Sequence, residues 1–171
     1  MCCRKIWKCN RLKRINHSFF KDLINNNSKY FPITDPKMTR FMISLEEGVN
    51  FVLSSLKMMQ GGEIFVPKLR ALRITDLAKT MDKTKKIKII GIRPGEKIHE
   101  VMCPKDESHL TVEFKKYYVI MPSIKFFNTT YNYFTNLSGE KGKFVKKDFE
   151  YSSNLTGNFL KIDEIKKIID L

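Results

Sequence analysis

Two arginines stand in surroundings that suit the binding of phosphate groups. Arg40 follows a turn that contains proline, and Arg93 ends the apolar stretch 86–92 and precedes Pro94 and Gly95. An arginine held by rigid backbone can donate two parallel hydrogen bonds to phosphate oxygens, so two such groups would suit a diphosphate. Each arginine taken alone also fits a surface or salt-bridged position, and spacing does not prove that the two converge.

Other motifs exclude several chemistries. His99-Glu100 begins like a zinc-protease motif, but Cys103 stands where the second histidine is needed. No G-x-G-x-x-G, Walker or G-x-S-x-G motif occurs, and no local pattern supports a Ser/His/Asp arrangement. We therefore predict neither catalytic residues nor a metal site in this chain. The remaining candidate ligands have spacings that fit no metal site: Cys2, Cys3, Cys9 and His17.

The composition is that of one folded, basic domain. The chain has 171 residues, of which 42% are hydrophobic, and a formal net charge of +14. Most lysines are spread along the chain, as expected of solvated surface. The basic segment from Arg4 to Arg14, which contains Trp7, keeps open the alternative of a small nucleic-acid-binding module.

The sequence favours a cytoplasmic location. The first residues build no apolar run typical of a signal peptide, and the longer apolar stretches are too short to span a membrane. The four cysteines show no disulfide framework, which fits a reducing compartment.

Hydrophobic periodicity predicts alternating helices and strands, and hence an α/β or α+β fold. One helix begins at Ser44, where Glu47 completes a capping box, and ends at residues 60–62. We expect Val49, Val52, Leu53 and Leu56 to form its buried stripe. The other expected helices are 18–24, a helix capped by Thr75 that carries Leu77, Ala78 and Met81, 98–102 and the tail with Ile162, Ile165, Ile168 and Ile169; the expected strands are 63–67, 86–92, 111–114 and 117–120, and 121–136 is expected to be loop.

Several stretches carry a family resemblance. FPITDPKMTRFMISLEEGVNFVLSSLKMMQGGEIFVPK (31–68) and KIIGIRPGEKIHEVM (88–102) resemble the inverting UDP-N-acetylglucosamine 4,6-dehydratases and their CapD-like, capsule-biosynthesis relatives. These belong to the extended short-chain dehydrogenase/reductase superfamily. The likeness continues at ITDLAK (74–79), YYVI (117–120), FEYSS (149–153) and the closing helix.

The resemblance implies a fold and an activity for the complete enzyme. A large NADP-binding Rossmann domain carries a smaller carboxy-terminal lobe that grips the UDP-sugar. A hydride leaves C4 of the sugar, water is eliminated across C5 and C6, and the hydride returns at C6. The 4-keto-6-deoxy product feeds capsule, lipopolysaccharide or flagellin-glycan synthesis. This chain resembles the substrate-side lobe, with most of the Rossmann domain missing.

The resemblance also implies substrate-binding residues. Arg40 and Arg93 match arginines that contact the UDP diphosphate, and Glu96 matches a residue that braces the loop or touches the sugar nucleotide. The segment Tyr151, Ser152 and Ser153 matches a late part of the family that lies near the bound substrate.

The chain departs from the family at its beginning. The cofactor loop, the Tyr-x-x-x-Lys pair and the acidic group for dehydration belong to an upstream half that this sequence lacks. Residues 1–14 form a basic segment outside the family pattern, and residues 15–171 follow it. We interpret the chain as a truncated or frameshifted dehydratase. We expect it to be inactive and to bind no NADP by itself, unless a separately encoded Rossmann half completes it. A homo-oligomer is left open as another form of assembly.

Overall fold

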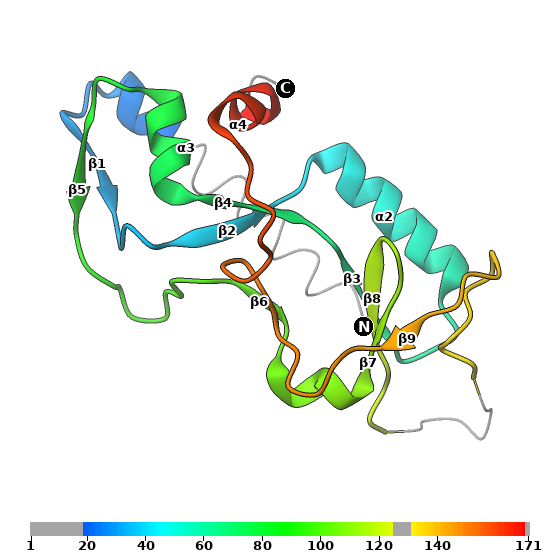
Figure 1. Ribbon diagram of the computed structural model, residues 1–171. Coiled ribbons are helices and arrows are strands. Elements are labelled where there is room, and N and C mark those ends of the chain that lie inside the picture. Colours follow the sequence, from blue (N-terminus) through cyan, green and yellow to red (C-terminus); the bar gives the residue numbers. More distant parts are fainter. Residues whose placement is uncertain (1–18, 125–130, 170–171) are drawn as a thin grey trace. The chain divides into compact units, whose positions relative to one another are not determined.

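The computed structural model describes residues 19–124 and 131–169, which form a mixture of helices and short strands (Figure 1). This confirms the predicted mixed α/β class. The chain divides into two compact units that interleave along the sequence. Unit 1 contains Leu45–Lys68 and Val101–Ser152, and unit 2 contains the described residues up to Ser44, Leu69–Glu100 and those from Ser153 onward. The predicted boundary at residue 14 lies outside the described residues.

Unit 1 is built on a four-stranded antiparallel sheet in the order β3 (Ile64–Pro67), β8 (Tyr117–Ile120), β7 (Thr111–Glu113) and β9 (Lys143–Phe144). Alternation along these strands buries Val112, Phe114, Tyr117 and Val119 in one core, and the helix α2 (Leu45–Met58) packs Phe51 and Met58 against it. The remaining elements of unit 1 are β6 (Val101–Cys103), the 3-10 helix η1 (Lys105–Leu110) and β10 (Tyr151–Ser152).

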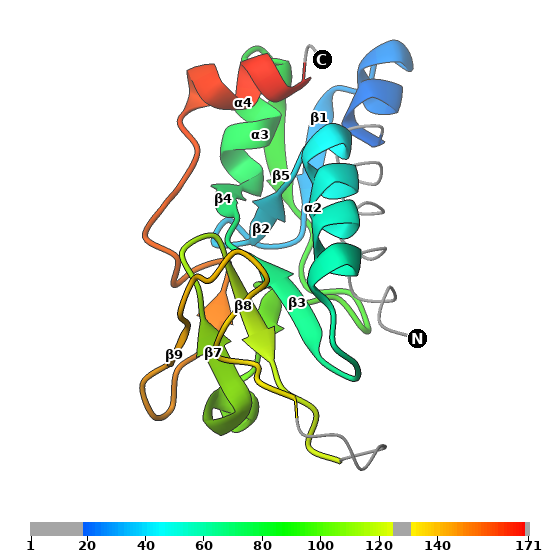
Figure 2. The same ribbon diagram turned by 90° about the vertical axis from the view of Figure 1, so that its right-hand side faces the viewer.

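Unit 2 has two strand pairs and three helices. Its core includes Phe31, Leu72, Leu77 and Ile165, because one face of each element is apolar. The helices α3 (Ile74–Met81) and α4 (Ile162–Ile169) lie side by side in this unit (Figure 2). The strands β1 (Tyr30–Ile33) and β5 (Lys86–Ile89) pair in parallel, β2 (Thr39–Met42) and β4 (Arg70–Arg73) pair antiparallel, and the helices are residues 19–25, α3 (Ile74–Met81) and α4 (Ile162–Ile169).

The predicted buried stripe of α2 is wrong. Val49, Leu53 and Leu56 are 49%, 52% and 54% exposed and Val52 is half-buried, while the buried residue of the helix is Ser55. The helix itself lies where the sequence predicts it. What differs is the face that meets the sheet of unit 1.

Three further local predictions differ from the structure. Residues 98–102 do not form a helix, because Val101–Cys103 is the strand β6 and pairs with β10. Thr75 does not cap α3, which begins one residue earlier at Ile74 and has Arg73 as its N-cap without a side-chain hydrogen bond. The strand expected at 86–92 ends at Ile89.

None of the helices within residues 19–124 and 131–169 combines the length and the apolar character needed to cross a membrane.

Candidate functional site

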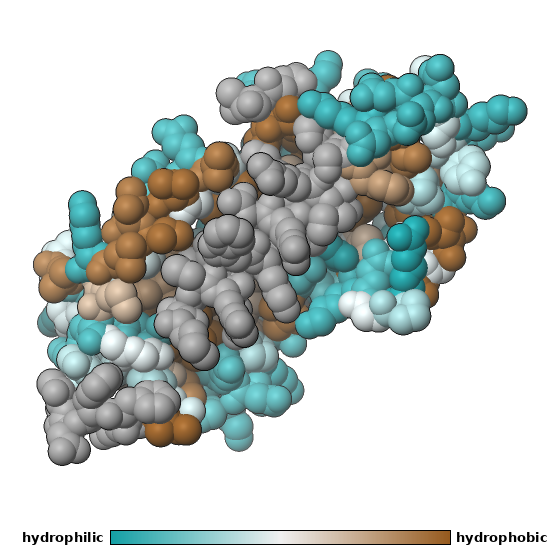
Figure 3. Space-filling view, turned by 180° about the vertical axis from the view of Figure 1, so that it is seen from behind, coloured by the Kyte–Doolittle hydropathy of each residue, from teal (hydrophilic) through white to brown (hydrophobic). Residues whose placement is uncertain are grey.

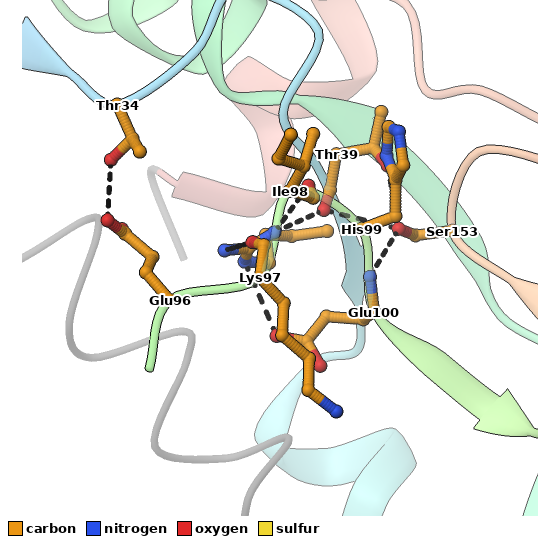
Figure 4. A network of polar contacts seen from close by, with 9 residues as sticks. Thr34, Thr39, Glu96, Lys97, Ile98, His99, Glu100 and Ser153 are labelled. Atoms are coloured by element: carbon orange, nitrogen blue, oxygen red, sulfur yellow. Dashed lines mark hydrogen bonds and ion pairs between the residues drawn. The ribbon is translucent and has the colours of Figure 1, made fainter. Parts of the chain in front are cut away.

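A network of polar contacts in unit 2 joins the start of β2 to residues 96–100 and to Ser153 (Figure 4). Arg40 lies at its centre and is only 6% exposed. Its Nη1 donates to the carbonyl oxygens of Thr39 at 2.7 Å and Ile98 at 2.9 Å, and its Nη2 donates to that of Lys97 at 2.6 Å. The guanidinium group therefore holds the backbone of Lys97 and Ile98, at the end of the R-P-G-E-K sequence, against β2.

The charge of Arg40 is balanced within the same network. Its Nε lies 3.5 Å from Oε1 of Glu100. Burial lowers the pKa of Arg40, while the carboxylates of Glu100 and Glu96 oppose that shift. Because an arginine pKa lies far above neutrality, the side chain stays charged.

A second set of contacts runs through buried hydroxyl groups. Thr39 Oγ1 lies 2.7 Å from Nδ1 of His99 and 2.6 Å from Oγ of Ser153. The backbone N–H of Glu100 donates to Ser153 Oγ at 2.9 Å, and the backbone N–H of Ser153 donates to the Glu100 carbonyl at 2.8 Å. Thr39 and Ser153 are 4% and 0% exposed, so water does not compete for these bonds.

Sequence reasoning missed Thr39 and His99 as members of this network. The zinc-protease pattern at His99 is incomplete, and the local sequence offers no sign that this side chain meets a hydroxyl 60 positions away. The signal that could have identified Thr39 and His99 was the family resemblance, because both residues lie inside the stretches that carry it.

The turn at residues 93–96 leaves Arg93 exposed. Glu96 N–H donates to the Arg93 carbonyl at 3.0 Å, and Gly95 has a φ of +79°, the left-handed conformation that glycine adopts at little cost. Glu96 Oε2 accepts a bond of 2.8 Å from Thr34 Oγ1, which braces the loop at its far end. Arg93 thus lies on a turn with its side chain in solvent.

The six predicted site residues do not all share this network. Arg40, Glu96 and Ser153 do, and Arg93 lies on the adjoining exposed turn. Tyr151 and Ser152 belong to unit 1 as the strand β10, where Tyr151 is 7% exposed and its ring lies 5.1 Å from that of Tyr118. Contact of the six residues with a UDP-sugar stays a prediction.

Within the described residues, the junction between β4 and α3 differs from the ordinary cradle for a dinucleotide. Such a cradle is a glycine-rich turn between a strand and the N-terminus of a helix. Here β4 leads into α3 directly from Arg73 to Ile74, without a glycine. That this chain binds no NADP by itself stays a prediction.

The cysteines and the histidine for which the sequence predicts no metal site, and the basic segment, are not part of the described structure. Cys2, Cys3, Cys9 and His17 lie outside the described residues, as does the segment Arg4–Arg14. Within 19–124 and 131–169, no group of three or more His, Cys, Asp or Glu side chains is placed to hold a metal ion.

Comparison with known proteins defines the class. The model of a family described as "Polysaccharide biosynthesis protein" matches residues 17–122, which is more than half of the chain. The chain therefore belongs to the polysaccharide biosynthesis protein family. It is 51% identical over 152 residues to a Campylobacter jejuni protein named UDP-N-acetylglucosamine 4,6-dehydratase (inverting), and the match covers 89% of this chain and 46% of that protein.

Two more distant matches cover a similar share of the chain. A UDP-glucose 4-epimerase of Rickettsia conorii is 34% identical over 145 residues, which cover 82% of this chain and 41% of that enzyme. The X-ray structure of Pen from Bacillus thuringiensis has a TM-score of 0.70 and 26% identity, covering 90% of this chain and 44% of that one. The chain thus spans about half the length of these relatives.

Proposed function

We propose that this chain is the sugar-nucleotide-binding half of an inverting UDP-N-acetylglucosamine 4,6-dehydratase that supplies sugars for polysaccharide, capsule or flagellin-glycan synthesis. The observation that carries the proposal is the 51% identity to the Campylobacter jejuni dehydratase over 89% of the chain. The network around Arg40 supports it, because an elaborate set of buried contacts orders the loop that presents Arg93.

The two arginines have different tasks in this proposal. Arg93, exposed on its turn, donates directly to the diphosphate of the UDP-sugar. Arg40 holds the backbone of residues 97–98 and thereby positions that turn, with its remaining N–H donors and its positive charge near the ligand. Glu96 keeps the turn closed through Thr34.

Catalysis is proposed to need the half of the enzyme that this chain does not span. The resemblance assigns NADP and the proton-transferring groups to that half, and proton and hydride transfer require such groups at the sugar ring. We propose that the isolated chain binds UDP-N-acetylglucosamine weakly and forms no 4-keto product, with or without added NADP.

Titration calorimetry with UDP-N-acetylglucosamine tests the binding part of the proposal. Charge-assisted bonds are worth about 1.5–3 kcal/mol, so Arg93→Ala should raise Kd roughly 10-fold or more. Lys86→Ala, which removes one exposed positive charge of β5, is the matched control and should leave Kd within about 2-fold. UDP should compete, and ADP should not.

Two results would count against the proposal. One is equal affinity for UDP- and ADP-sugars, which would mean that only charge is recognised. The other is steeply salt-dependent binding of nucleic acid with no response to UDP-sugars, which would favour the nucleic-acid alternative.

A further inference from the structure

The helix α2 presents three different faces. With roughly 100° between successive residues, Gly48, Phe51, Ser55 and Met58 lie on one face, which packs on the core of unit 1. Polar residues occupy a second face: Glu46, Glu47, Asn50, Ser54 and Lys57.

The third face is apolar and exposed. We call Leu45, Val49, Leu53, Leu56 and Met59 the outer stripe; they are 61%, 49%, 52%, 54% and 45% exposed. Met59 joins the stripe because its backbone N–H donates to the Ser55 carbonyl at 2.8 Å and extends the helical turn. Figure 3 shows hydrophobic side chains gathered along the position of α2.

The outer stripe has the pattern of a surface that is normally covered. Its members recur at spacings of three and four residues and span an arc of about 120°, the width of the apolar stripe by which an amphipathic helix packs on a core. Single exposed apolar residues are ordinary, but a continuous stripe along a whole helix marks an interaction surface.

The length of the relatives points to the occupant. The Campylobacter jejuni dehydratase matches this chain over 46% of its length, and Pen matches it over 44%. In both proteins more than half of the polypeptide lies outside the match, and that part is long enough to fold as a domain of its own beside the matched half.

We infer that the outer stripe of α2 is the docking surface for a folded partner equivalent to the half of the dehydratase relatives that this chain does not span. The inference rests on the proposed function, since that function calls for such a half. The partner presents an apolar surface to the stripe and leaves the polar face of α2 in water.

Co-expression with the unmatched half of the Campylobacter jejuni dehydratase tests the inference. The full chain should co-purify with that half as a one-to-one complex in light scattering. Leu53→Glu, in the middle of the outer stripe, should lower the recovered complex at least 10-fold. Ser54→Glu adds the same charge one residue away on the polar face and should leave the recovery unchanged. Circular dichroism of each variant checks folding, and Leu56→Gln serves as the second variant if Leu53→Glu does not fold.

Three results would overturn the inference: no co-purification with the unchanged chain, equal loss for Leu53→Glu and Ser54→Glu, or a homodimer of this chain that Leu53→Glu dissociates. The ligand titration separates the two proposals. If a complex forms through the outer stripe but does not bind UDP-N-acetylglucosamine, the proposed function is wrong and the docking surface stands. Nucleotide binding through Arg93 without a stripe-dependent complex sinks the docking surface alone.

Discussion

The hydroxyl of Ser153 links parts of unit 2 that are far apart in sequence. It accepts the backbone N–H of Glu100 and lies 2.6 Å from Thr39 Oγ1, with no exposed surface. Ser153→Ala leaves a buried donor without its acceptor, so we expect the free energy of unfolding to fall by about 1–3 kcal/mol. Urea denaturation followed by circular dichroism measures it, with the exposed Ser54→Ala as control. A loss as small as that of the control would show that the bond is not formed in solution.

Gly142 is another residue for which a small change has a large expected effect. A Cβ atom there would lie 2.6 Å from Val112 Cγ1 and 2.7 Å from Phe114 Cζ, both in the core of unit 1. We expect Gly142→Ala to destabilise the protein by about 1–3 kcal/mol through overpacking. Thermal unfolding beside the exposed Lys141→Ala measures the effect. An unchanged melting temperature would mean that the core yields at this point.

At the scale of residues, the sequence predicts only part of the network around Arg40. The resemblance selects Arg40, Glu96 and Ser153, and the structure gathers these three in one network. The sequence does not show that Arg40 is buried and bonded to carbonyl oxygens while Arg93 is exposed. Burial depends on how residues 96–100 fold back on β2, and local patterns carry no information on such a contact.

At the scale of elements, a bidentate ion pair joins β4 to α4. Arg70 donates to the Glu164 carboxylate at 2.6 and 2.7 Å. The bonds from Arg70, followed by the backbone N–H of Lys161, lower the pKa of Glu164 from 4.5 to about 2. A carboxyl with a depressed pKa in the folded state stabilises above its unfolded pKa and loses that contribution as pH falls through its folded pKa.

The direction of this pKa shift gives a test of the ion pair between Arg70 and Glu164. Glu164→Gln should be less stable than the unchanged protein at pH 7, and the gap should close between about pH 4.5 and pH 2. Urea denaturation across that range measures it. Asp22→Asn, on the exposed side of helix 19–25, should show no comparable gap. A gap that does not depend on pH would assign the effect to packing and not to charge.

The sequence predicts elements well where the periodicity is local. The helices α2 and α4 and the strands β3, β7 and β8 lie where the pattern places them. The strands β6 and β10 escape prediction because each has two or three residues and exists only through the other, with Cys103 opposite Tyr151. The wrong face of α2 has a similar cause, since two of its three faces are apolar and the pattern does not say which one packs within the chain.

At the scale of the whole molecule, the outer stripe of α2 predicts non-specific aggregation, and no defined homodimer, when the chain is expressed alone. Exposed contiguous apolar surface promotes aggregation. We expect Leu53→Glu to raise the soluble fraction at least about 2-fold and to sharpen the gel-filtration peak, while Ser54→Glu, with the same added charge, does less. A sharp monomer peak and cooperative unfolding of the unchanged chain would contradict this expectation.

The interleaving of the two units was beyond sequence reasoning, and it bears on how a nascent chain would fold. The apolar residues Leu72 and Leu77 leave the ribosome long before Leu160 and Ile165, which complete the same core. At about 5–20 residues per second, roughly 80 residues of synthesis correspond to several seconds. During that interval the unfinished core is open to chaperones and to neighbouring nascent chains, so we expect the yield of folded protein to depend on how fast the chain is translated through α4.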